Sequence, residues 1–272
     1  MAIFNNILNM IFDLLLYPFR ELEPIWGLVF VSVVTGILML VVFKRTSNQE
    51  GINNIKDRLK AHLLELRLYK DDIGLSYDAL KNIFGANFKY IFYMGKPMLF
   101  LMVPMMLILI HLATRYEYRP LRVGESAIIS LKLNDASVLN EIALYPPVGI
   151  RLETPPLRIF QENQIDWRIK AVQSGDWDLV FRTGDESVTK KLLVGSKLVR
   201  LAPRRIGRQL IDQLLNPAEP PIPHSSIVKE IRVQYPTRGL SVWGWQVHWL
   251  IIFFGLSIIA GYAMKGVFGV EI

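Results

Sequence analysis

The chain has 272 residues, of which 51% are hydrophobic and 20% are charged, with a formal net charge of +7 and no cysteine. This composition excludes disordered and fibrous proteins, and the lack of cysteine excludes disulfides, zinc–thiolate sites and iron–sulfur clusters. Because a mean hydropathy of +0.29 accompanies this many charges, apolar and polar residues must fall in separate blocks.

The first block, residues 1–24, has an apolar stripe at helical spacing with asparagines and one aspartate between its members. The stripe consists of Phe4, Ile7, Leu8, Ile11, Phe12 and Leu15. This pattern predicts an extracytoplasmic amphipathic helix that lies in the membrane interface. Pro18 and Pro24 end it before the next block.

Three uncharged runs follow, at residues 25–43, 97–114 and 242–264. Each meets or approaches the roughly 20 residues that a helix needs to cross a bilayer, so three transmembrane helices are expected. Buried helices of a soluble core are the less favoured alternative. Residues 44–96 carry ten Lys or Arg against six acids, whereas 1–24 carry one against three. The positive-inside rule therefore predicts an inner-membrane protein with its N-terminus outside and a cytoplasmic tail at 265–272.

The segment 44–96 is predicted to form a cytoplasmic helical hairpin. Its first arm, residues 51–72, has a heptad-like seam of Ile52, Ile55, Leu59, His62, Leu66 and Tyr69, widened by Leu63. Such a seam favours pairing with a second helix, expected over residues 77–93. His62 is interpreted as a seam residue and not as a metal ligand.

Residues 1–114 resemble the YidC/Oxa superfamily of membrane protein insertases. The resemblance rests on the order of segments, on Trp26-Gly27 at the first span, and on Gly95-Lys-Pro97-Met-Leu99 with Pro104. It implies an insertase or chaperone that assists other membrane proteins, similar to the three-span members of the superfamily. Two departures are the absence of a basic residue within Gly36-Ile37-Leu38 and an added domain before the third span. They support the alternative of a non-catalytic scaffold subunit of a larger membrane complex.

That added domain, residues 115–241, is predicted to be an extracytoplasmic all-β domain resembling an immunoglobulin-like sandwich. Short alternating strands are expected at 126–133, 165–171, 177–181, 187–194 and 229–235. An amphipathic helix is expected over 205–215, followed by a proline-rich linker.

Two surfaces are candidates for contact with partners. The first, for a substrate helix or a partner subunit, consists of Ser32, Thr35, Met94, Met98, Met102, Met105 and Met106. Methionine adapts to varied apolar partners, although ordinary helix packing is the alternative. The second, for anionic lipid or an acidic partner protein, consists of Lys190, Lys191, Lys197, Arg200, Arg204, Arg205 and Arg208. A simply solvated face is the alternative there.

The sequence contains no motif for a nucleophile, a metal site or a phosphate-binding loop. We therefore expect no enzymatic activity, no cofactor and no metal. The expected partners are membrane lipids and other membrane proteins, and not nucleic acid.

Overall fold

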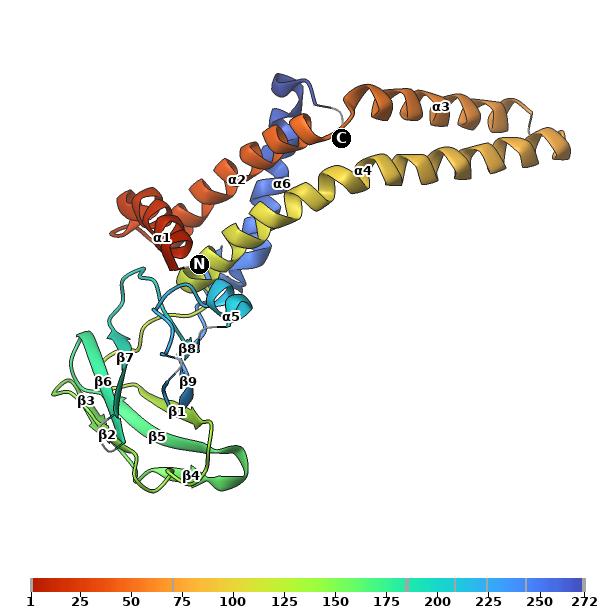
Figure 1. The fold of residues 1–272 in the computed structure, drawn as a ribbon. Helices are drawn as coiled ribbons and strands as arrows, with labels where there is room; N and C mark the ends of the chain where they lie inside the picture. Colours follow the sequence, from red (N-terminus) through yellow and green to blue (C-terminus); the bar gives the residue numbers. More distant parts are fainter. Residues whose placement is uncertain are drawn as a thin grey trace. The chain divides into compact units, whose positions relative to one another are not determined.

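A computed structural model describes residues 2–69, 71–183, 186–207, 209–223, 225–242 and 244–270 (Figure 1). The chain divides into two compact units. One comprises residues 1–27 and 108–249, and the other comprises residues 28–107 and 250–272.

Three helices are long and apolar enough to cross a membrane, as the uncharged runs predict. They are α2 (Pro24–Thr46), α4 (Ile73–Tyr116) and α6 (Trp249–Phe268). α6 begins seven residues after the predicted start at Val242. The intervening residues form a hairpin of β10 (Leu240–Val242) and β11 (Trp245–Val247), with Gly244 at a φ of +85° in its turn. That backbone conformation favours glycine because other residues carry a Cβ that clashes there.

Helices α2 and α6 approach each other closely at glycine. A Cβ on Gly36 would lie 2.4 Å from the carbonyl oxygen of Ser257, and a Cβ on Gly261 would lie 3.6 Å from the Gly36 carbonyl oxygen. At the end of α2, the Lys44 ammonium donates a hydrogen bond of 2.5 Å to the Phe268 carbonyl at the end of α6. The two helices therefore run in the same direction, with their C-terminal ends together.

The predicted hairpin is formed by α3 (Gln49–Leu68) and the first half of α4, which lie side by side (Figure 1). Asn48 caps α3, its side-chain oxygen accepting from the Gly51 N–H at 2.9 Å. Of the predicted seam, Ile52 and Ile55 are buried, whereas Leu63 and Tyr69 are exposed.

The second arm and the second span are one continuous helix, not the two separate helices that were predicted. Helix α4 runs through Gly95, Pro97 and Pro104 without a break. Proline removes a backbone donor and normally ends a helix, but apolar helices tolerate it inside membranes.

The other unit begins with α1 (Ala2–Leu16) and a 3-10 turn, η1 (Tyr17–Phe19), and contains two antiparallel sheets besides the β10–β11 hairpin. The first sheet has the order β3-β5-β1-β9-β8, with β4 also paired to β5. Its strands are β1 (Ser126–Leu133), β3 (Ile150–Leu152), β4 (Leu157–Ile159), β5 (Gln164–Ala171), β8 (Arg204–Ile206) and β9 (Val228–Val233). The second sheet, β2-β6-β7, consists of β2 (Ala143–Tyr145), β6 (Gly175–Thr183) and β7 (Glu186–Val194).

The inward residues of both sheets share one apolar core. Trp167 of β5 meets Phe181 of β6 with 5.5 Å between ring centroids, and Ile129, Leu131 and Leu179 are fully buried. The predicted strands at 126–133, 165–171, 177–181, 187–194 and 229–235 are thus confirmed within a few residues, and so is the β domain. Its immunoglobulin-like character stays a prediction.

The predicted helix over 205–215 is wrong in its first half. Arg204–Ile206 form β8, whose residues pair with Glu230–Arg232 of β9, and only α5 (Leu210–Leu215) is helical. Pairing along β9 outweighs the helical periodicity of residues 205–208 because it satisfies the backbone hydrogen-bonding groups of both strands.

Elsewhere in this unit, a 3-10 turn, η2 (Phe160–Glu162), precedes β5.

Candidate functional site

The polar side of α1 forms hydrogen bonds and an ion pair with other segments of its own unit. The side-chain amides of Asn5 and Asn9 each donate a 2.8 Å hydrogen bond, to the carbonyls of Gln213 and Pro217 respectively. One turn further, the Asp13 carboxylate lies 2.5 Å from the Arg115 guanidinium. Because the three residues are spaced four apart, they lie on one face of the helix, and both asparagines are buried.

The opposite side of α1 exposes large apolar side chains, with Met10 and Leu14 each 74% exposed and Phe4, Ile7 and Ile11 also exposed. A surface helix of a soluble protein has the reverse arrangement, with its apolar stripe toward the core. An outward apolar face is typical of an amphipathic helix that lies in a membrane interface, so the interfacial position of α1 stays a prediction.

A cavity of about 900 Å³ lies beside α1. Its first wall is the end of α1 with η1, including Asp13, Leu16 and Tyr17. The second wall is the outward face of β6 and β7. The third comprises residues 197–205 and 218–220.

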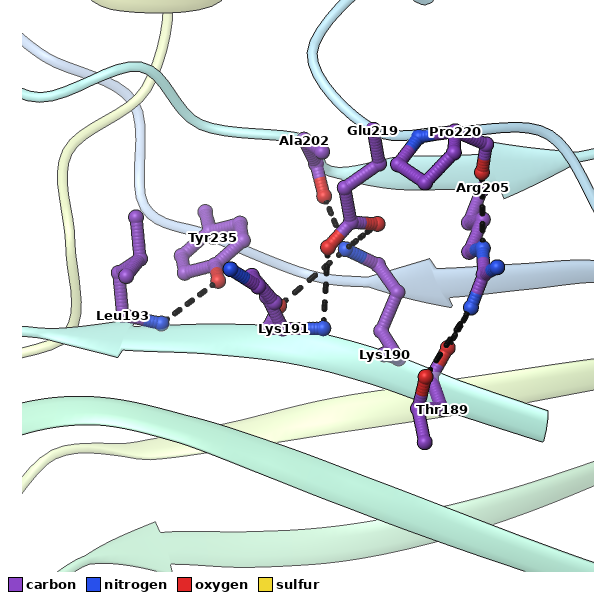
Figure 2. Close-up of polar contacts among 9 residues, drawn as sticks. All are labelled: Thr189, Lys190, Lys191, Leu193, Ala202, Arg205, Glu219, Pro220 and Tyr235. Carbon is purple, nitrogen blue, oxygen red and sulfur yellow. Dashed lines mark hydrogen bonds and ion pairs between the residues drawn. The ribbon is translucent and has the colours of Figure 1, made fainter. Parts of the chain in front are cut away.

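One buried cation fixes the third wall of this cavity to β7 (Figure 2). The Lys190 side chain is 0% exposed, and its ammonium donates to the Glu219 carboxylate at 2.8 Å and to the Ala202 carbonyl at 2.5 Å. Burial lowers the pKa of Lys190, and the charge and hydrogen bond of Glu219 oppose that shift. The Lys190 ammonium therefore links β7 to the segments around residues 202 and 219.

Most of the remaining contacts in Figure 2 lie at the edge of β7 that does not pair with β6. The Lys191 N–H donates to Glu219 at 3.0 Å, and the Leu193 N–H donates to the Tyr235 hydroxyl at 3.1 Å. Arg205 donates to the carbonyls of Thr189 and Pro220. Side chains thereby occupy backbone groups that an exposed edge would offer to another strand.

The predicted basic cluster is largely neutralised inside the molecule. Besides the ion pair of Lys190 with Glu219, Lys197 pairs with Glu21 at 2.8 Å, Arg200 lies 3.5 Å from Asp13, and Arg204 pairs with Glu230 at 2.7 Å. The Glu21 pKa is lowered because its carboxylate accepts a hydrogen bond from Lys197. Arg208 lies outside the described residues. Four of the seven predicted members thus have a carboxylate partner among the described residues, and the role of the cluster toward lipid or an acidic partner stays a prediction.

Sequence reasoning missed the acidic partners, Asp13, Glu21 and Glu219, because they are far from the cluster along the chain. The sequence does contain one signal for Asp13. The four-residue spacing of Asn5, Asn9 and Asp13 puts three polar side chains on one face of the helix, and in the structure this face contacts other segments of the protein.

In the unit of residues 28–107 and 250–272, the residues predicted to contact a substrate helix or partner separate into a buried group and an exposed group. Ser32 and Thr35 are buried in α2, where the Ser32 hydroxyl donates to the Leu28 carbonyl at 2.7 Å. Met94 packs against a cluster that contains Leu40 and Phe43. The exposed members are Met98, Met102 and Met106, while Met105 is half-buried.

No model of a known protein family matches the chain, and no curated protein matches it. Among the residues that the structure describes, no three His, Asp or Glu side chains gather in a way that could hold a metal ion. The features that the structure offers for binding are the exposed methionines of α4 and the charged cavity beside α1.

Proposed function

We propose that this chain is a membrane protein insertase or chaperone of the YidC/Oxa type, which receives apolar segments of other membrane proteins and lets them partition into lipid. The observation that supports this function best is an apolar stripe along α4. Phe84, Phe88 and Phe92 lie one turn apart and are 73%, 75% and 78% exposed. The stripe continues along the same helix to Met98 and Met102.

An exposed row of phenylalanines is costly in water. Burying a phenylalanine side chain contributes roughly 2–3 kcal/mol, so three of them favour an apolar partner by several kcal/mol. Contiguous exposed apolar surface of this kind marks an interaction site. The methionines further along α4 are flexible and polarizable, and they accommodate varied side chains. The stripe thus provides a path from the hairpin to the span.

The orientation of the chain belongs to the same proposal. Lys44, Arg45, Lys96 and Lys265 flank the spans at the hairpin side, which places the hairpin and the C-terminus in the cytoplasm. In this arrangement the spans lie in the inner membrane and the β domain lies in the periplasm. No nucleotide or other cofactor is required, because partitioning into lipid supplies the free energy.

Site-specific photocrosslinking tests the function. A crosslinker at Phe88 or Met102 should capture a stalled nascent chain that carries an apolar segment, and should fail to capture the same chain with a polar segment. Lys60 on α3, an exposed charged position, provides the matched control. Equal capture from Lys60, or capture that ignores the polarity of the segment, would contradict the proposal.

The alternative is a non-catalytic scaffold subunit that binds partners through the β domain. Its specific support is the exposed end of β2 with the loop that follows, where Tyr145 of β2 and Val148 of the loop are exposed. A crosslinker at Val148 that captures one partner in stoichiometric amount, together with no capture from Phe88, would favour the scaffold over the insertase.

A further inference from the structure

We propose that the cavity beside α1 binds the headgroup of an anionic phospholipid, with the acyl chains lying against the exposed apolar face of α1. This site is independent of the proposed insertase activity. It rests on the position of the cavity, its charge balance and its continuity with an apolar surface.

The position of the cavity matches the depth of lipid headgroups. Arg115, in the last turn of the membrane-spanning helix α4, lines the cavity and pairs with Asp13 of α1. A residue at the end of a span lies where the hydrocarbon layer gives way to headgroups. The outward apolar face of α1 is at the same level, since Asp13 belongs to its opposite side.

The charge balance of the cavity favours an anion. Five carboxylates line it, those of Asp13, Glu21, Asp176, Asp178 and Glu219. Six cations line it, those of Arg20, Arg115, Lys191, Lys197, Arg200 and Arg205. Lys190 adds a seventh cation through its bond to Glu219, so cations exceed carboxylates by two. A phosphodiester carries one negative charge and accepts hydrogen bonds from such groups.

Two of these cations are available for a ligand. Among the described residues, no carboxylate oxygen lies within 4.0 Å of the Lys191 ammonium or the Arg20 guanidinium. Arg20 instead lies over the Tyr17 ring, 5.3 Å from its centroid. The other cations already have carboxylate or carbonyl partners. Lys191 and Arg20 are therefore the residues expected to contact the phosphate.

The continuity of the wall favours a lipid over a soluble phosphate. Tyr17 lines the cavity and is itself exposed, and it follows directly on the helix that exposes Met10 and Leu14. A ligand whose phosphate enters the cavity can lay its acyl chains along these side chains. A cavity of about 900 Å³ has room for the headgroup and its bound water.

Native mass spectrometry of the full chain in detergent, titrated with phosphatidylglycerol, tests the site. The first phosphatidylglycerol should bind roughly tenfold more weakly to the double variant Arg20→Gln/Lys191→Gln than to the unchanged chain, because two basic contacts are lost. Neither substitution removes an ion pair of the described structure. Lys229→Gln, an exposed lysine of β9 outside the cavity, removes the same type of charge and should leave the affinity unchanged.

Three probes define the opposite outcomes. Phosphatidylcholine binding as tightly as phosphatidylglycerol would overturn the preference for an anion. Soluble glycerophosphoglycerol binding as tightly as the lipid would overturn the role of the acyl chains. A polyglutamate peptide that displaces phosphatidylglycerol would assign the cavity to an acidic protein partner.

The variants carry their own controls. Equal weakening of binding by Lys229→Gln would show that the positive charge of the protein attracts the lipid without a defined site. A circular dichroism melt identical for all variants confirms that each is folded.

Discussion

At the scale of single residues, Lys190 illustrates how this chain uses charge inside a protein core. It sits on the inward face of β7, at a position that alternation reserves for apolar side chains such as Val188 and Leu192. Its ammonium is satisfied by Glu219 and by two carbonyls, those of Lys191 and Ala202. A buried charge persists only with such partners, because the cost of removing it from water is large.

Replacing Lys190 should therefore destabilise the protein through the charge that is left behind. Lys190→Met is expected to lower stability by about 3–5 kcal/mol, because Glu219 remains nearly buried without its partner. The measurement is the thermal midpoint of the full chain in detergent, followed by circular dichroism, with a fall of roughly 10 °C. Lys229→Met, at an exposed position of β9, should change the midpoint little.

The double variant Lys190→Met/Glu219→Gln separates this explanation from a simple loss of packing. Since it leaves no buried charge, it should recover most of the lost stability. A double variant as unstable as Lys190→Met alone would mean that the lysine stem and its packing, not the ion pair, stabilise the site.

At the scale of elements, sequence patterns predict best where one local rule decides the structure. The alternation at Ile165, Trp167 and Ile169 sets β5, and the uncharged runs set the three spanning helices. The predictions fail where pairing with a residue that is distant in the sequence determines the local structure. Residues 205 and 206 belong to the predicted helix 205–215 but pair with β9, and the predicted third span 242–264 begins with residues that form the β10–β11 hairpin instead.

The candidate sites divide in the same way. The methionine spacing follows from the sequence, because a single helix fixes which side chains share a face. The cavity does not follow from the sequence, because its carboxylates and cations come from residues 13–21, 115, 176–178, 191–205 and 219. Only the tertiary pairing of Lys197 with Glu21 and of Lys190 with Glu219 reveals which charges are used.

The contact between α2 and α6 yields a prediction at this scale. Gly36→Val places side-chain atoms where the Ser257 carbonyl lies only 2.4 Å from the first added carbon, so the helices must separate. Such overpacking costs about 1–3 kcal/mol and should lower the thermal midpoint and increase cleavage by protease in detergent. Gly255→Val in α6 is the control, since nothing lies within 4 Å of a Cβ there. Equal effects of both variants would mean that the Gly36 contact does not hold α2 and α6 together.

At the scale of the whole molecule, the direction of the spans constrains which segments share a side of the membrane. α2 and α6 run in the same direction, since Lys44 at the end of one bonds to Phe268 at the end of the other. Both ends are basic, and the hairpin of α3 and α4 follows directly from α2. The topology that we propose therefore puts the hairpin and the C-terminus on one side of the membrane and the β domain, which lies between α4 and α6 in the sequence, on the other.

The natural absence of cysteine makes this arrangement directly measurable. Ser187→Cys, at an exposed position of β7, should react with a membrane-impermeant maleimide in cells whose outer membrane alone is permeabilised. Lys60→Cys, on the exposed side of α3, should react only after the inner membrane is opened. The unchanged chain has no thiol and gives the background. Labelling of Lys60→Cys before Ser187→Cys would reverse the orientation, and it would place the phenylalanine stripe of α4 where no nascent chain emerges, so the insertase proposal would fall with it.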